Sequence, residues 1–172
     1  ETMEKRNVTV SAIVAAIVLI GDQLSKHWAE TWLRTNGEYK IWDGVLHLRY
    51  VENRGAAFGM MQGGKWFFLA ITGIACAAML YFLIKERKRL HFMMTFSIAL
   101  LLSGAIGNLI DRVALGYVRD MIYVALIDFA VFNVADMAVT VGCCLLVLDL
   151  LFFKGKKYME MMDKKPQTGE NS

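Results

Sequence analysis

The sequence predicts an all-α integral membrane protein with four transmembrane helices and a small extracytoplasmic antiparallel β-sheet. Its residues are 56% hydrophobic and its mean hydropathy is +0.42, above the usual range of soluble domains. Two uncharged segments, Trp66 to Ile84 and Phe92 to Ile110, each provide the 19 residues that a bilayer-spanning helix needs. Residues 39–58 differ, because they are rich in β-forming side chains.

The predicted helices span about residues 8–25, 66–84, 92–110 and 134–153. The first and fourth segments are apolar except for acids near their ends: Asp22 closes the first, and Asp136 opens the fourth. The first segment could instead be a cleaved signal peptide, because basic residues precede its apolar run. Bulky Leu19, at a position where cleavage needs a small residue, favours a retained helix.

Clusters of Lys and Arg flank three of the predicted membrane ends, at residues 5–6, 85–89 and 154–157. By the positive-inside rule, these ends and both termini face the cytoplasm. Asp149 is expected either to extend toward the membrane surface or to pair with the lysines near it. Nucleic-acid binding is not expected, because basic runs this close to membrane ends act in orientation and lipid contact.

The region 39–58 is predicted to form the extracytoplasmic sheet on the membrane surface. Asp43-Gly44 lies between β-rich runs, which is a hairpin signal. The sheet leads to Asn53, which can both donate and accept hydrogen bonds, and to Gly55, where the backbone can approach another group closely. The apolar stretch 121–129 is too short to span the membrane, so we predict an interfacial loop that could act as a lid.

Four acids fall between positions 111 and 136, beside the predicted helices: Asp111, Asp120, Asp128 and Asp136. Ionisable groups at the edge of a hydrocarbon layer are costly, so they usually have a partner or a function. Asp111 and Arg112 end the third helix, and we expect them to form a structural ion pair that braces the site. Asn108 lies on the same helix face.

Asp120 and Asp136 are the candidate catalytic pair. Two close carboxylates that share one proton can activate a water molecule and protonate the leaving nitrogen of a peptide bond. Asn133 is placed to cap the fourth helix, so a plain capping role for Asp136 is the alternative; its position beside a second acid favours catalysis. For Asp22 two interpretations stay open: pairing with Lys26, or holding a polar substrate group or a facing helix.

The sequence predicts no metal site and no cofactor. Its three histidines are scattered over different segments, and its three cysteines lie in apolar helices as small hydrophobic residues. We expect residues 1–163 to form a single membrane-embedded domain. The polar segment 164–172 is predicted to be a disordered tail.

Five segments carry the polar residues in a fixed order: Asp22-Gln23-Leu24-Ser25-Lys26, Asn53-Arg54-Gly55-Ala56-Ala57-Phe58, Gly107-Asn108-Leu109-Ile110-Asp111-Arg112, Tyr117-Val118-Arg119-Asp120 and Phe132-Asn133-Val134-Ala135-Asp136. Together they resemble the motifs of lipoprotein signal peptidase, the bacterial signal peptidase II. The resemblance implies catalytic aspartates at Asp120 and Asp136. It also implies substrate-binding or site-bracing positions at Asp22, Asn53, Gly55, Asn108, Asp111, Arg112, Asn133 and Ala135.

The family resemblance also implies what the protein acts on and where. The expected activity is that of an aspartic endopeptidase, which removes the signal peptide from diacylglyceryl-modified prolipoproteins on the amino side of the lipidated cysteine. The expected partners are these substrates, membrane lipids and globomycin-like cyclic peptide inhibitors. The expected form is a monomer in the bacterial cytoplasmic (inner) membrane, with the active site toward the extracytoplasmic side.

Two other function classes fit parts of the sequence. An ion or proton translocator would also place acids in helices, but it would distribute them through the membrane depth. Here all the acids but Asp149 gather toward one side. A lipoprotein-binding or assembly module without catalysis could use the predicted amphipathic sheet.

Overall fold

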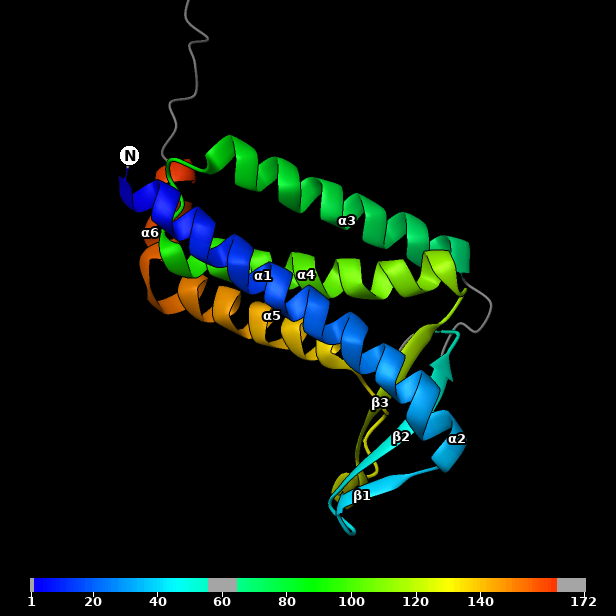
Figure 1. Ribbon diagram of the computed structural model, residues 1–172. Coiled ribbons are helices and arrows are strands. Elements are labelled where there is room, and N and C mark those ends of the chain that lie inside the picture. The colour runs from blue at the N-terminus through cyan, green and yellow to red at the C-terminus, as the bar shows by residue number, and fades with distance from the viewer. Residues whose placement is uncertain (1, 56–64, 164–172) are drawn as a thin grey trace, which may run out of the picture.

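A computed structural model describes residues 2–55 and 65–163, and it shows a helical bundle with a small sheet at one end (Figure 1). The long helices are α1 (Thr2–Trp28), α3 (Lys65–Glu86), α4 (Phe92–Ala114) and α5 (Val134–Phe152). The described residues contain four helices long and apolar enough to cross a membrane, which confirms the predicted fold class. The predicted tail, 164–172, lies outside the described residues.

The first helix is longer than its apolar core. It continues from α1 through a π-helical segment, Ala29–Leu33, into the short α2 (Arg34–Asn36), and ends at Gly37 with a φ of 84°. Ala29 and Leu33 are buried against Met121 of the sheet. The extension therefore joins the membrane bundle to the sheet.

Helix α4 is the centre of the bundle, and the other three long helices pack against it. Small residues allow this. A side chain on Gly104 would collide with the Ala135 carbonyl of α5, and one on Gly107 would approach Asp22 Oδ2 of α1 to 2.6 Å. The close approach brings the ends of α1, α4 and the start of α5 together next to the sheet.

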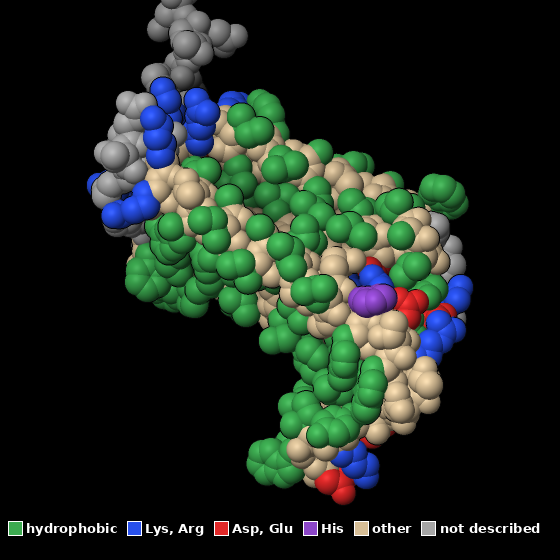
Figure 2. All heavy atoms as spheres, viewed as in Figure 1, with side chains coloured by type: hydrophobic (Ala, Val, Ile, Leu, Met, Phe, Trp, Pro, Cys, Tyr) green, Lys and Arg blue, Asp and Glu red, His purple; other side chains and the backbone are tan. Residues whose placement is uncertain are grey.

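The outer faces of the bundle are apolar, as expected of a surface in contact with lipid. Large exposed side chains include Ile17 on α1, Ile74 on α3 and Phe152 on α5. Figure 2 shows hydrophobic side chains along the bundle, and Lys and Arg side chains gathered at the end near the N-terminus, away from the sheet.

The sheet has three antiparallel strands in the order β1 (Tyr39–Trp42), β2 (Leu46–Asn53) and β3 (Val118–Val124). The predicted turn at Asp43-Gly44 is confirmed, with Gly44 at a φ of 72°. The predicted loop 121–129 is wrong in its first half, because Met121 to Val124 belong to β3. A strand is stable here because β2 supplies its hydrogen-bonding partner from more than sixty residues away along the chain.

The end of the bundle opposite the sheet contains a buried acid in contact with a histidine. Asp149 is fully buried, and its Oδ1 lies 2.8 Å from His91 Nε2, so the partner that the structure shows is a histidine rather than one of the expected lysines. A further helix, α6 (Lys154–Asp163), follows α5. Gly155 of α6 lies against the Asp149 carboxylate, where a Cβ would come within 2.6 Å of Oδ2.

Candidate active site

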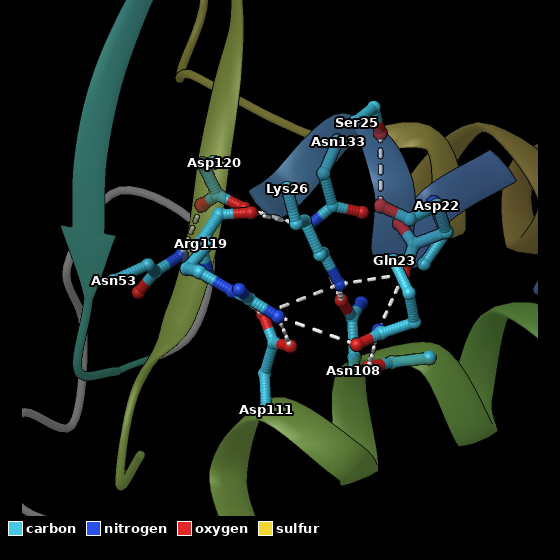
Figure 3. Close-up of polar contacts among 12 residues, drawn as sticks. Asp22, Gln23, Ser25, Lys26, Asn53, Asn108, Asp111, Arg119, Asp120 and Asn133 are labelled. Atoms are coloured by element: carbon cyan, nitrogen blue, oxygen red, sulfur yellow. Dashed lines mark hydrogen bonds and ion pairs between the residues drawn. The ribbon is translucent and has the colours of Figure 1, made fainter. Parts of the chain in front are cut away.

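Asp120 lies in β3 and is held by two asparagine side chains. Asn53 Nδ2 donates a hydrogen bond to Asp120 Oδ2 at 3.0 Å, and Asn133 Nδ2 donates one to Oδ1 at 2.6 Å (Figure 3). Asp120 is only 2% exposed. The sheet therefore places this carboxylate against the start of α5.

Asp136 lies in the first turn of α5 and forms a capping box with Asn133. The Asp136 N–H donates to Asn133 Oδ1 at 2.9 Å, and the Asn133 N–H donates to Asp136 Oδ2 at 3.1 Å. The other carboxylate oxygen, Oδ1, accepts from Asn108 Nδ2 at 2.7 Å. The predicted cap at Asn133 is confirmed, and the capping role leaves Asp136 Oδ1 directed toward Asn108 and the cavity beside it.

The amide groups of Asn53 and Asn133 have defined orientations. Asn133 Oδ1 accepts from a backbone N–H of α5, and Asn53 Oδ1 accepts from the Gly55 N–H at 3.1 Å, so in both residues Nδ2 must face Asp120. Gly55 thus acts through its backbone. Each carboxylate of the pair accepts two N–H donors, an arrangement that holds both side chains in fixed rotamers.

The environment of Asp120 keeps a proton available near neutral pH. Burial and, second to it, the neighbouring Asp136 side chain raise the pKa of Asp120 to about 7, and the hydrogen bonds from Asn53 and Asn133 oppose this rise. Two neighbouring carboxyl groups that share one proton can act as the acid and the base of peptide hydrolysis.

A second polar network lies behind the acid pair and centres on Lys26. Lys26 is fully buried, and its Nζ lies 2.9 Å from Asp22 Oδ2, 3.5 Å from Asp111 Oδ2 and 2.9 Å from Asn108 Oδ1, to which it donates. Asp22 Oδ1 accepts from the Ala135 N–H at 2.8 Å. Both interpretations of Asp22 are therefore correct in part: it pairs with Lys26 and it holds the facing helix α5.

The expected ion pair between Asp111 and Arg112 is wrong. Asp111 pairs with Arg119, whose Nη2 lies 2.8 Å from Asp111 Oδ1 and whose backbone N–H donates to Oδ2 at 2.9 Å. Arg119 also reaches Glu30 at 2.9 Å. Consecutive residues on a helix do not face each other, so Arg112 points elsewhere. Its guanidinium lies 5.1 Å from the Phe68 ring and interacts electrostatically with Asp136 and Asp120.

A cavity of about 550 Å³ opens beside the acid pair. Its polar wall consists of the predicted site residues Asn53, Gly55, Asn108, Arg112, Asp120 and Asp136. Its apolar wall comes from residues 129–132 and from α5 residues 137, 139 and 141. The other four predicted site residues lie behind the polar wall and hold it in place: Asp22, Asp111, Asn133 and Ala135.

Sequence reasoning did not select Lys26 and Arg119 as site residues, although both lie inside the quoted segments. Each of them is a basic residue close to acidic residues in an otherwise apolar segment. A buried ion-pair network requires such basic residues, so this pattern could have indicated them. In the two described ranges, no group of three or more His, Cys, Asp or Glu side chains could hold a metal ion. The buried acids Asp22, Asp111 and Asp120 gather in one network at the sheet end of the bundle.

Comparison with known proteins identifies the family. A family model described as signal peptidase (SPase) II matches residues 14–152. The chain belongs to the signal peptidase II family. It is therefore an integral membrane peptidase of the aspartic type, and both the family and the predicted fold class are confirmed.

Individual members of the family match over most of their length. The chain is 46% identical over 142 residues to the lipoprotein signal peptidase of Streptococcus thermophilus, covering 82% of this chain and 92% of the relative. It is 44% identical over 145 residues to that of Clostridioides difficile, covering 84% and 97%. A bacterial membrane enzyme solved by the in meso method at 2.3 Å resolution superposes with a TM-score of 0.77 at 33% identity, covering 94% of this chain and 95% of that one.

Proposed function

We propose that this signal peptidase II removes the signal peptide from diacylglyceryl-modified prolipoproteins, on the amino side of the lipidated cysteine, with Asp120 and Asp136 as its catalytic residues. The observation that carries this proposal is the position of the two carboxylates. Both line a cavity whose other lining residues are largely apolar, at the end of a membrane bundle. A peptide bond next to a lipidated residue fits such a cavity.

The mechanism needs one proton on the acid pair. The ionised carboxylate takes a proton from a water molecule, and the water oxygen attacks the scissile carbonyl carbon. The protonated carboxyl group donates its proton toward the carbonyl oxygen and, on collapse of the tetrahedral intermediate, the pair protonates the leaving nitrogen. Asn53, Asn108 and Asn133 fix the two carboxylates during these transfers.

Arg112 supports the same step from the cavity wall. Its positive charge faces Asp120 and Asp136 and favours a net negative charge on the pair. Apolar α5 side chains from Met137 to Val141 line the part of the cavity where acyl chains would lie. Membrane lipids and globomycin-like cyclic peptides are the other ligands that we propose for this cavity.

The orientation follows from charge. The end of the bundle rich in Lys and Arg lies in the cytoplasm of a bacterium, so both helical termini are cytoplasmic and the sheet with the active site is extracytoplasmic. We further propose that the protein acts as a monomer in the cytoplasmic (inner) membrane and binds no nucleic acid.

The experiment is a cleavage assay with purified protein in detergent micelles. A synthetic lipobox peptide with a diacylglyceryl cysteine is incubated with wild type, with an Asp120→Asn, Asp136→Asn double variant, and with Asp43→Asn as a control on the exposed turn of the sheet. We expect mass spectrometry to show one cut before the modified cysteine for wild type and control only. Equal cleavage by the double variant would remove the acid pair from the mechanism.

A further inference from the structure

A second cavity, of about 490 Å³, lies between α1 and α3 and has α4 as its floor. None of the residues that line it lines the active-site cavity. It exists because, over the described residues, α1 and α3 each pack on α4 and barely touch each other. We refer to it as the α1–α3 groove.

The lining of the α1–α3 groove is mostly apolar, and three of its four polar side chains lie near one end. Helices α1 and α4 start at the basic end of the molecule and α3 finishes there, so Ser11, Arg87 and Thr95 line the groove near that end. Farther along, toward the sheet, the lining includes Leu19 and Ile106. A ligand that fits this distribution has a polar, negatively charged head and a long apolar tail.

Ser11 supplies a second indication of a ligand. It is 2% exposed and lines the groove, and its Oγ has no hydrogen-bond partner within residues 2–55 and 65–163. The other two hydroxyl groups of the lining are satisfied internally: Thr95 Oγ1 donates to the His91 carbonyl and Ser103 Oγ to the Leu100 carbonyl. A buried hydroxyl without a partner is unfavourable, so a rotation of the Ser11 side chain toward an acceptor in the groove would give a net gain.

We propose that the α1–α3 groove binds one acyl chain of an anionic phospholipid from the leaflet at the basic end of the bundle. The phosphate lies beside Arg87, an ester carbonyl accepts from Ser11 Oγ, and the chain runs over α4 toward Leu19 and Ile106. Lys85, Lys88 and Arg89 add positive charge at the same end, which favours an anionic over a zwitterionic headgroup.

The size of the groove argues against a transmembrane helix as its occupant. One turn of helix with its side chains, about 10 Å wide and 5.4 Å long, occupies roughly 420 Å³. A groove of about 490 Å³ thus holds little more than one turn, whereas a spanning helix has five or more. A single extended acyl chain uses the same volume along the length of the groove.

The lipid has a structural consequence for α3. This helix packs on α4 along one side only, and the groove lies on its flank toward α1. An acyl chain in the groove supports that flank and holds α3 in the bundle. Because α3 carries Phe68, on whose ring the Arg112 guanidinium lies, the bound lipid also stabilises one contact of the active-site cavity.

The test measures lipid retention and thermal stability, and it does not depend on peptidase activity. Delipidated full-length protein is titrated in detergent with dioleoyl phosphatidylglycerol or dioleoyl phosphatidylcholine. Native mass spectrometry counts bound lipids, and intrinsic tryptophan fluorescence gives the melting temperature. We expect one retained phosphatidylglycerol molecule per chain, a saturable rise in melting temperature, and weaker retention of phosphatidylcholine.

Paired variants locate the site. Ala16→Leu fills the groove, and Arg87→Gln removes its charge. The matched controls are Ala78→Leu, an exposed position on the opposite face of α3, and Lys40→Gln, an exposed lysine of β1 at the other end of the molecule that does not line the groove. We expect Ala16→Leu to abolish retention and Arg87→Gln to weaken it roughly fivefold, the factor that corresponds to about 1 kcal/mol per basic residue near a membrane surface.

Three outcomes would overturn the proposal. Equal retention of both lipids by wild type would show that the headgroup is not recognised. Equal losses in the groove variants and their controls would place the lipid elsewhere. If Ala16→Leu changed the oligomeric state while the retained lipid stayed the same, the groove would be a contact between copies of the chain.

Discussion

The raised pKa of Asp120 predicts that activity falls as the pH rises above about 7. Peptide hydrolysis by the acid pair requires one proton on it, and the alkaline limb of the pH profile reports the loss of that proton. Burial and the charge of Asp136 raise the pKa of Asp120 to about 7 from its ordinary value of 3.8. The alkaline limb of kcat/KM should therefore have an apparent pKa near 7, which belongs to the pair.

The size of the effect follows from this pKa. At a pH one unit above this pKa, about one enzyme molecule in eleven still carries the shared proton on the acid pair. The value of kcat/KM should therefore fall about tenfold by pH 8 and about a hundredfold by pH 9. The assay is initial-rate cleavage of a diacylated lipobox peptide that has no group titrating between pH 6 and 9. A profile that stays flat to pH 9 would refute the assignment of the shared proton to this pair.

The same shift predicts how stability depends on pH, with a fixed sign. The pKa of Asp120 is higher in the folded than in the unfolded state, so its protonated form is favoured by folding. Its contribution is then most favourable near pH 4 and is lost as the pH rises to about 7. At about 1.4 kcal/mol per pH unit, the loss over this range is about 4 kcal/mol.

Asp120→Asn isolates this contribution. An asparagine accepts from only one of the two amide groups that now donate to Asp120, so the variant should lose about 1–3 kcal/mol at low pH. The asparagine does not titrate, however, so the variant avoids the loss of stability that wild type suffers as Asp120 loses its proton. The melting temperature of the variant relative to wild type should therefore rise between pH 4 and pH 8. Asp43→Asn, on the exposed turn, is the control, and its melting temperature relative to wild type should show no such rise.

Three further predictions test the rest of the site. Asp136→Asn should lower kcat by at least about a hundredfold while the variant still binds uncleaved substrate in a pull-down, and loss of binding would count against a purely chemical role. Arg119→Ala should destabilise the protein by about 3–5 kcal/mol in a melting assay, because it strands the buried charge of Asp111; Arg54→Ala, which is exposed, should change stability by less than about 1 kcal/mol. Arg112→Ala should lower kcat/KM with little change in melting temperature, and a large drop in melting temperature would restore a bracing role.

The membrane helices were predictable because their signal is local. Apolar runs of spanning length, such as Trp66 to Ile84, need no knowledge of the remaining chain. The strand β3 was not predictable in the same way. Its sequence contains Arg119 and Asp120 within an apolar run, and only pairing with β2 shows that these two side chains point into a polar network and not into solvent.

The candidate site divides along the same line. Asp120, Asp136 and the asparagines that bind them could be selected from the sequence. Acids and amides are costly in an apolar membrane segment, so they usually have a partner or a function. The partner of Asp111 could not be selected. Arg112 is adjacent in sequence, yet the helix turns its side chain toward the cavity, and Arg119 reaches Asp111 because β3 folds back over the end of α4.

The N-terminus of α5 shows why the polar residues of separate segments depend on one another. A helix start leaves its first N–H groups without internal partners. Here the Ala135 N–H donates to Asp22 on α1, and the Asp136 N–H donates to Asn133, whose amide then faces Asp120. The hydrogen bonds that satisfy the helix end therefore position Asp136 directly. They also orient Asn133, which donates a hydrogen bond to Asp120. A substitution at Asp22 should consequently disturb the acid pair, although its carboxylate lies behind the cavity wall.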